Sequence, residues 1–307
     1  MNILVTGSSG WLGQTLVPRL RRDGHLVVGL DPEPGATTDI VGSVVSRALV
    51  RATIRDKRID AIVHAAARHK PHIETHDNSE FVAVNVQGTL NLLEEAVEAR
   101  VSRFVFTSTT SLMISQKIRD GKAGGAREAI WIDETMSPLQ PRNIYGVTKL
   151  AAEDLCRLFH QLHSLPVVIL RTSRFFPEED DMAHAIAQSG ENTKANELLF
   201  RRLSVEDAAE AHVVALAKAP EIGFDTFIVS ALTPFSPSDC RELIADAPSV
   251  VSRYFPEYRA KYARRGWTMF DSIDRVYDST KAMRRLGFVC RTNFDIVLRQ
   301  MEREDDT

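Results

Sequence analysis

A glycine-rich turn near the start of the sequence limits the folds open to this chain more than any other feature. Residues 7–13 read Gly-Ser-Ser-Gly-Trp-Leu-Gly, directly after a short apolar stretch (residues 2–6) and at the start of helix-like residues 11–23. Glycine lets the backbone turn tightly and approach a pyrophosphate, and a helix N-terminus presents free N–H groups at its positive end. This context predicts a dinucleotide site with contacts from Gly7, Ser9, Gly10, Trp11, Leu12 and Gly13.

An acidic residue follows at the position where such a site needs one. Asp31 comes directly after the second apolar stretch (residues 26–30), about 20 residues past the glycines. An acid there can bind the ribose hydroxyls and repels a 2′-phosphate, so the sequence favours NAD over NADP. The alternative is that Asp31 only begins the turn before Pro32.

The first half of the chain alternates strand-like and helix-like segments, as an α/β protein with a parallel sheet should. Further strands are predicted at residues 61–64, 103–107 and 167–171, and helices at 81–99 and 145–163. Residues 116–142, rich in glycine and proline, predict a long loop beside the site.

Two structural units are expected from this pattern. Residues 1–171 should form a Rossmann doubly wound parallel sheet that binds NAD, and a helix at 205–218 and a strand at 226–230 should return to it. The segments at about 172–204 and 231–307 are expected to form a smaller C-terminal substrate lobe.

Composition limits the partners. A formal net charge of −3 gives no electrostatic reason to expect nucleic acid or an acidic membrane surface. The apolar run at residues 3–5 is too short for a secretory signal, and no stretch approaches the length of a transmembrane helix. Cys156, Cys240 and Cys290 form neither a metal motif nor a disulfide framework. We therefore expect a cytoplasmic protein with reduced thiols and no bound metal.

Tyr145 and Lys149 supply a pair suited to proton transfer. They are four residues apart and therefore share one face of the predicted helix. A tyrosine phenol titrates near pH ~10, but a neighbouring ammonium stabilises the phenolate and lowers this pKa. A hydroxyl at another strand end can then hold the substrate oxygen during hydride transfer; Thr109 is the predicted donor, with Thr110 and Ser111 as alternatives. The competing interpretation is an amphipathic helix carrying an ordinary tyrosine and lysine.

Five motifs, in this order, resemble those of the extended short-chain dehydrogenase/reductases, the branch that contains nucleotide-sugar epimerases and dehydratases. They are the glycine turn, His64-Ala65-Ala66-Ala67, Asn85-Val86-Gln87-Gly88-Thr89, Thr107-Ser108-Thr109 and Tyr145-Gly146-Val147-Thr148-Lys149. The resemblance covers roughly residues 1–230 and implies an NAD-dependent enzyme that acts on a secondary hydroxyl of a sugar or nucleotide sugar.

The resemblance also implies further contacts and an assembly. Asp39 and Ile40 would flank the adenine, and a homodimer would pack through the helices that begin near residues 81 and 145. Other implied cofactor contacts are Ala65, Ala66, Ala67, Asn85, Thr107 and Ser108.

Departures from the family patterns bear on the reaction. The 4,6-dehydratases carry an Asp-Glu pair after the catalytic Thr, where this chain has Thr110-Ser111, so dehydration is disfavoured. The 4-epimerases usually carry Tyr and Asn where Met113 and Arg174 stand, although Arg174 can still pair with a phosphate or carboxylate of the substrate. Residues 170–178 resemble the uronate dehydrogenases, which oxidise free sugar acids with NAD. We expect an epimerase-type reaction, with a sugar or sugar-acid dehydrogenase as the alternative.

Other interpretations concern the whole protein and its tail. A non-catalytic dinucleotide sensor is the rival from another class, and such proteins commonly lack the Tyr/Lys pair. Basic and aromatic residues alternate over residues 253–265, where a solvated amphipathic helix is favoured over a lid that covers the substrate. His64 is expected to be a buried strand residue rather than a catalyst.

Overall fold

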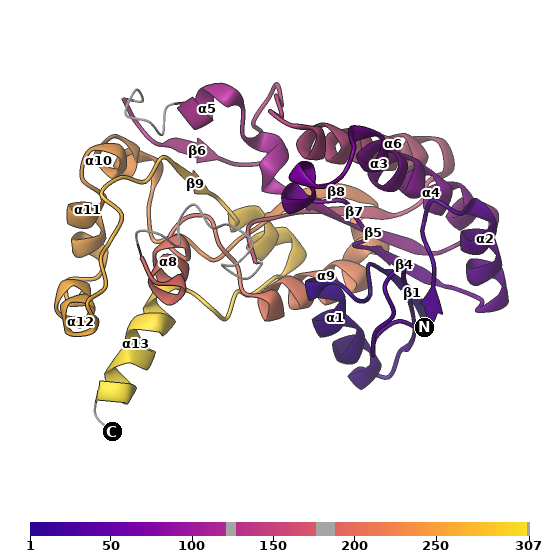
Figure 1. The fold of residues 1–307 in the computed structure, drawn as a ribbon, viewed down its shortest axis with the longest axis horizontal. Coiled ribbons are helices and arrows are strands. Elements are labelled where there is room, and N and C mark those ends of the chain that lie inside the picture. The colour runs from indigo at the N-terminus through magenta and orange to yellow at the C-terminus, as the bar shows by residue number, and fades with distance from the viewer. Residues whose placement is uncertain (121–126, 176–187, 306–307) are drawn as a thin grey trace.

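The computed structural model describes residues 1–120, 127–175 and 188–305. A seven-stranded parallel sheet lies at its centre, in the order β3-β2-β1-β4-β5-β7-β8 (Figure 1). The order reverses between β1 and β4, the switch point outside which α/β proteins bind ligands. The predicted doubly wound sheet is therefore confirmed. Its strands are β1 (Asn2–Thr6), β2 (Leu26–Asp31), β3 (Ile40–Val41), β4 (Ala61–His64), β5 (Arg103–Thr109), β7 (Val167–Thr172) and β8 (Phe224–Val229).

Helices cover both faces of this sheet. Because successive side chains of a strand point to opposite faces, Ile3 and Val5 pack on one side and Leu4 packs on the other. The first side is covered by α1 (Trp11–Arg22) and α9 (Val205–Ile222), and the second by α2 (Arg47–Asp56), α4 (Gly88–Glu98) and α6 (Ile144–His163).

The local predictions differ from the structure in two places. The helix predicted at residues 81–99 consists of α3 (Asn78–Phe81), a π-helical stretch (Val82–Gln87) and α4. The loop predicted at 116–142 is wrong in part, because it contains α5 (Gln116–Asp120) and β6 (Ile130–Ile132). β6 pairs in parallel with β9 (Arg275–Tyr277), far along the chain, and a local pattern carries no information about such a partner. Residues 205–230, predicted to return to the sheet, contain α9 and β8, and β8 pairs with β7.

A second cluster of elements lies at the other end of the molecule (Figure 1). Its core contains Tyr258, Tyr262 and Phe294, all buried. Lys261 is buried as well, and its Nζ pairs with Glu302 at 2.7 Å. The tail segment at 253–265 is therefore held by its own core and ion pairs. The helices here are α8 (Gly190–Glu197), α10 (Cys240–Ala245), α11 (Ala247–Tyr254), α12 (Tyr258–Arg265) and α13 (Phe294–Asp305).

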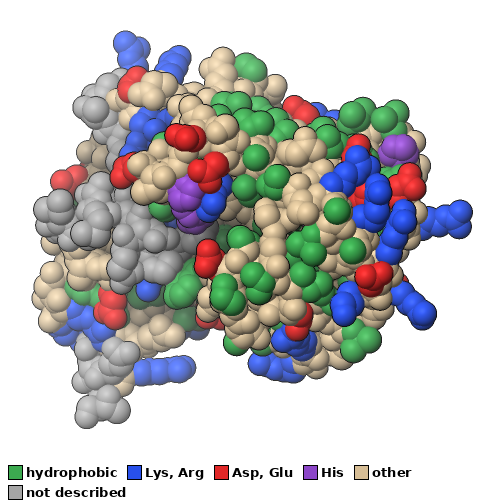
Figure 2. All heavy atoms as spheres, turned by 45° about the vertical axis from the view of Figure 1, so that its right-hand side comes forward, with side chains coloured by type: hydrophobic (Ala, Val, Ile, Leu, Met, Phe, Trp, Pro, Cys, Tyr) green, Lys and Arg blue, Asp and Glu red, His purple; other side chains and the backbone are tan. Residues whose placement is uncertain are grey.

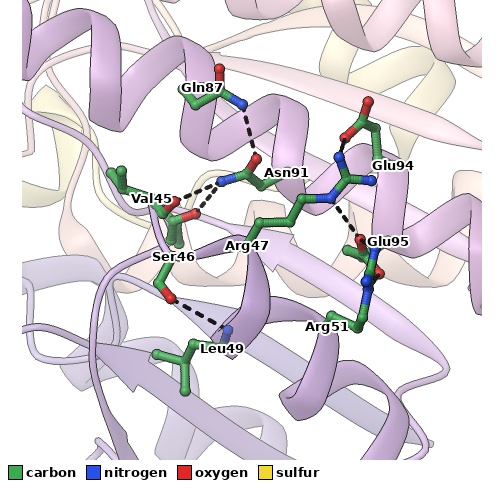
Figure 3. A network of polar contacts seen from close by, with 10 residues as sticks. Val45, Ser46, Arg47, Leu49, Arg51, Gln87, Asn91, Glu94 and Glu95 are labelled. Carbon is green, nitrogen blue, oxygen red and sulfur yellow. Dashed lines mark hydrogen bonds and ion pairs between the residues drawn. The ribbon is translucent and has the colours of Figure 1, made fainter.

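A polar network joins α2 and the loop before it to α4 (Figure 3). The Asn91 amide donates to the Val44 carbonyl at 3.0 Å. The buried Glu95 carboxylate accepts from Arg47 and Arg51, each at 2.9 Å. These bonds fix the loop that follows β3, which reaches the pocket described below.

Acidic and basic side chains intermingle on the face shown in Figure 2. Within the described part of the chain, none of the helices combines the length and the apolar character needed to span a bilayer. All three cysteines are free thiols.

Candidate active site

A pocket of about 660 Å³ opens at the carboxyl ends of the parallel strands. This volume lies within the usual range for small-molecule sites. Gly7 after β1, Asp31 at the end of β2, Ala65 after β4 and Thr109 at the end of β5 all line it. Arg275 and Tyr277 from β9 also line the pocket, so the second cluster of elements contributes to its wall.

The glycine turn packs so closely that side chains could not replace its glycines. Gly7 has a φ of 75°, and a Cβ atom there would lie 2.7 Å from the Ala66 nitrogen. A Cβ atom on Gly13 would lie 2.3 Å from the Gly7 carbonyl oxygen, so Gly13 is required for packing inside the turn. Gly10 is the N-cap of α1 and supplies no side-chain cap, which leaves the N–H groups of the first turn for a ligand. The turn therefore fits a pyrophosphate group.

Asp31 lies beside this turn and is 8% exposed. Its Oδ2 accepts a hydrogen bond from the Ser9 backbone N–H at 3.1 Å, and its Oδ1 accepts one from Glu33 N–H at 2.9 Å. The carboxylate thus starts the turn before Pro32 and also lines the pocket. The contact with Glu33 agrees with the turn interpretation, and a contact of Asp31 with a ribose stays a prediction.

Tyr145 and Thr109 meet in the pocket although they come from different elements. Asn143 begins α6 as its N-cap, with Oδ1 accepting from the Gly146 N–H at 2.9 Å, and this cap places Tyr145 in the first turn. Burial raises the pKa of Tyr145 to about 12, while a side-chain hydrogen bond with Thr109 acts to lower it. The Thr109 hydroxyl also accepts from the Ser111 N–H at 3.1 Å, which fixes its position.

Lys149 lies one turn further along α6 and also lines the pocket. It is 2% exposed, and its Nζ lies 3.9 Å from the centroid of the Phe106 ring. Burial lowers the pKa of Lys149 to about 7, and the negative charge of Glu153 acts in the opposite direction.

Glu153 is a buried anchor that the sequence analysis missed. Its carboxylate accepts from Arg171 Nη2 at 2.7 Å and Nε at 3.0 Å, and from Ser108 Oγ at 2.5 Å. These contacts tie α6 to β5 and β7 directly below the pocket. The spacing of four residues from Lys149 could have identified Glu153 as a neighbour on the same helix face.

Several predicted residues lie elsewhere. Asp39 and Ile40 are not among the described residues that line the pocket, and Gly42, Ser43 and Val44 are found there instead. The Asp39 carboxylate accepts from the Gly29 N–H at 2.8 Å, which holds it against β2. The other predicted pocket residues that do line it are Ser9, Gly10, Trp11, Leu12, Ala65, Ala66, Ala67, Thr107, Ser108, Thr110, Ser111 and Arg174.

Asn85 and His64 support the pocket from behind. Asn85 is buried, accepts from the Arg68 N–H at 2.8 Å and donates to Thr148 Oγ1 at 2.9 Å, so it joins the loop after β4 to α6. His64 is fully buried, with Nδ1 2.7 Å from Thr6 Oγ1, as expected of a buried strand residue. Burial lowers the pKa of His64 well below its usual value.

Arginines are the largest group of pocket residues that the sequence analysis missed. Only Arg174 was predicted, and nothing in the local sequence marks the others, because they reach the pocket from separate elements. The arginines that line the pocket are Arg68, Arg119, Arg142, Arg174, Arg201 and Arg275. Residues 176–178, part of the stretch that resembles uronate dehydrogenases, lie outside the described residues. Across the described ranges, no cluster of three or more His, Cys, Asp or Glu side chains could hold a metal.

The sequence and structure are similar to known proteins. The model of the NAD dependent epimerase/dehydratase family matches residues 3–226. A relative described as an uncharacterized UDP-glucose epimerase of Bacillus subtilis is 32% identical over 190 residues, which cover 56% of this chain and 55% of the relative. Human dTDP-D-glucose 4,6-dehydratase is 28% identical over 190 residues, covering 57% of this chain and 50% of that protein. The matches thus span about half the length of these relatives.

Solved structures share the fold along the whole chain. UDP-N-acetylglucosamine 4-epimerase from Bacillus cereus has a TM-score of 0.66 at 22% identity and covers 100% of both chains. UDP-glucuronic acid 4-epimerase from Bacillus cereus, solved in complex with NAD, has a TM-score of 0.65 at 20% identity and covers 99% of both chains.

Proposed function

This chain belongs to the NAD dependent epimerase/dehydratase family, and on that premise we propose that it is an enzyme that binds NAD and transfers a hydride at a secondary hydroxyl of a sugar or nucleotide sugar. The observation that carries the proposal is the meeting of Tyr145, Lys149 and Thr109 in one pocket with the glycine turn. A proton-transferring phenol, a cation and a hydroxyl donor in a cofactor pocket are the groups that this chemistry requires.

The residues around the glycine turn fit NAD. Gly7 and Gly13 allow the turn to pack closely on its own backbone and on the loop after β4, and the first turn of α1 offers its N–H groups to the pyrophosphate. Asp31 would accept hydrogen bonds from the ribose hydroxyls and would repel a 2′-phosphate, which favours NAD over NADP. When bound, NAD supplies the hydride acceptor and donor.

Each catalytic side chain has a distinct task in this proposal. Thr109 holds the reacting hydroxyl oxygen, which its fixed position at the end of β5 permits. Tyr145 removes the proton from that hydroxyl and returns it in the reverse direction. Lys149 binds the ribose and, when protonated, stabilises the Tyr145 phenolate.

The burial of Tyr145 makes the charge of Lys149 important. A pKa of about 12 leaves almost no phenolate at neutral pH. A cation nearby favours the charged form of the phenol, and the pKa of Lys149, about 7, leaves part of the lysine population protonated at neutral pH. We infer that Tyr145 becomes a base only when Lys149 carries its proton.

We favour an epimerase-type reaction, and a dehydrogenase of a free sugar or sugar acid is the alternative. The two share the first hydride transfer and differ in whether the oxidised sugar stays bound. Epimerases among the relatives and structural neighbours support the first choice. Thr110 and Ser111 stand where the family's dehydratases carry an acidic pair, which disfavours dehydration. A homodimer packed through α4 and α6 remains an expectation from the family resemblance.

One experiment tests this proposal and separates its two forms. The protein is mixed with NAD and a panel of sugar nucleotides, free aldoses and uronic acids, and NADH absorbance is followed together with product analysis. An isomerised sugar without net NADH would establish the epimerase. Stoichiometric NADH would establish the dehydrogenase. If NAD binds but the whole panel stays unchanged, the enzyme proposal gives way to a non-catalytic dinucleotide sensor.

A further inference from the structure

The wall of the pocket contains more basic than acidic side chains. Six arginines line the pocket, and one of them, Arg68, pairs with Glu80 at 3.3 Å. The acids that do line the pocket, Asp31 and Glu33, lie beside the glycine turn, where Ser9 contacts both.

Buried acids pair with two further arginines of the pocket wall, Arg201 and Arg275. Glu197, fully buried, accepts from Arg201 at 2.5 Å, and it also pairs with Arg202 at 2.9 Å. Asp274 accepts from Arg275 at 2.6 Å. These carboxylates explain how Arg201 and Arg275 are stabilised in buried positions.

Arg119 and Arg142 have no such compensation. Neither guanidinium makes an ion pair or a hydrogen bond with another described residue, although both line the pocket. Arg119, on α5, is half-buried, and Arg142, just before α6, is exposed. Burial lowers the pKa of Arg119, and the charges of Arg275, Arg142 and Arg201 lower it further, while Asp274 acts in the opposite direction. A guanidinium stays protonated in proteins, so this group of charges attracts an anion.

The position of these two arginines relates them to the reacting sugar rather than to the cofactor. Arg142 precedes Tyr145 by three residues, which limits the distance between their Cα atoms to roughly 11 Å, and an arginine side chain can span most of that. Arg119 follows the short helix (Thr110–Met113) that begins directly after Thr109. Ser111 and Ile114, between Thr109 and Arg119 in sequence, line the same pocket.

We propose that Arg119 and Arg142 bind a carboxylate carried on the reacting sugar, so that the substrate is a sugar acid, either free or linked to a nucleotide. The inference rests on the proposed function, because it needs Tyr145 and Thr109 to mark the reacting hydroxyl. Two planar guanidinium groups can bind a carboxylate bidentately, which fixes the orientation of the ring as well as its charge. A neutral hexose has no carboxylate with which these two guanidinium groups could pair.

The test compares acidic sugars with neutral ones of the same configuration. Binding of glucuronate, galacturonate and mannuronate, and of glucose, galactose and mannose, is measured by calorimetry on NAD-saturated protein, each sugar free and as its uridine diphosphate derivative. The variants are Arg119→Gln and Arg142→Gln. Lys117→Gln is the matched control, since Lys117 is an exposed cation on the same helix that does not line the pocket.

We expect at least one acid to bind more tightly than its neutral counterpart. Each arginine variant should weaken binding of that acid about tenfold or more, with little change for the neutral sugar and no change in the Lys117 control. The inference is overturned if no acid binds more tightly than its counterpart, or if the arginine variants weaken UDP-linked neutral and acidic sugars equally, because the arginines would then bind the diphosphate. Either result with NAD binding intact leaves the proposed function standing, whereas failure to bind NAD overturns that function itself.

Discussion

Replacing Lys149 with methionine should change how the stability of the ligand-free protein depends on pH. Burial lowers the pKa of this lysine from 10.5 to about 7. Between these values the unfolded chain holds a proton that the folded protein lacks, so wild-type stability rises with pH across that window. From pH 7 to pH 9.5 these two values give a rise of about 3 kcal/mol. Methionine keeps the apolar stem without an amine, so the variant should lack this rise.

Urea unfolding at both pH values measures the effect as a difference between the two proteins. The free energy of unfolding of Lys149→Met minus that of the wild type should decrease by about 3 kcal/mol from pH 7 to pH 9.5. Other titrating groups are common to both proteins and largely cancel in the difference. Lys57→Met, which alters an exposed lysine after α2, is the control and should give the same difference at both pH values. A difference for Lys149→Met that stays constant within about 1 kcal/mol would refute the reasoning about its burial.

Three further substitutions test the supports of the pocket. Glu153→Gln should lower the free energy of unfolding by about 3–5 kcal/mol, because it leaves a buried arginine without its carboxylate; denaturant unfolding checks this against Glu98→Gln on the exposed side of α4, and equal losses would contradict it. Gly7→Ala should weaken NAD binding in a fluorescence titration more than Gly24→Ala does. Both glycines have a positive φ, but only at Gly7 would a Cβ atom meet crowded backbone atoms. Equal loss of NAD binding in the two variants would contradict a special role for Gly7 in the cofactor site. Asp31→Ser should reduce the preference for NAD over NADP about tenfold or more, and an unchanged preference would remove its role at the ribose.

The central sheet could be predicted because its signals are local. Residues 2–6 and 61–64 are short apolar stretches, and the observed β1 and β4 have those same bounds. The connection from β1 to α1 could also be predicted, because its tight backbone requires glycine and the glycines are visible in the sequence. By contrast, β6 could not be predicted, because its three residues are stabilised by pairing with β9 from a distant part of the chain.

The residues of the site also differ in whether a local sequence signal marks them. Tyr145 and Lys149 are related by helix spacing, and Thr109 by its place at a strand end, so the amino-acid sequence alone is enough to propose all three. Arg119 and Arg275 reach the pocket only after α5 and β9 have packed against the sheet. The adenine contact expected of Asp39 came from a family pattern. In the structure its carboxylate accepts a hydrogen bond from the Gly29 N–H instead.

The most direct test of the central claim is a comparison of Tyr145→Phe with the wild type on the first substrate that the panel identifies. The phenylalanine ring keeps the shape of the side chain and removes the hydroxyl that transfers the proton. We predict that NAD binding is retained, within a few-fold, while turnover falls by about 10²-fold or more. Turnover at the wild-type level would contradict the account, because Tyr145 would then take no part in the chemistry.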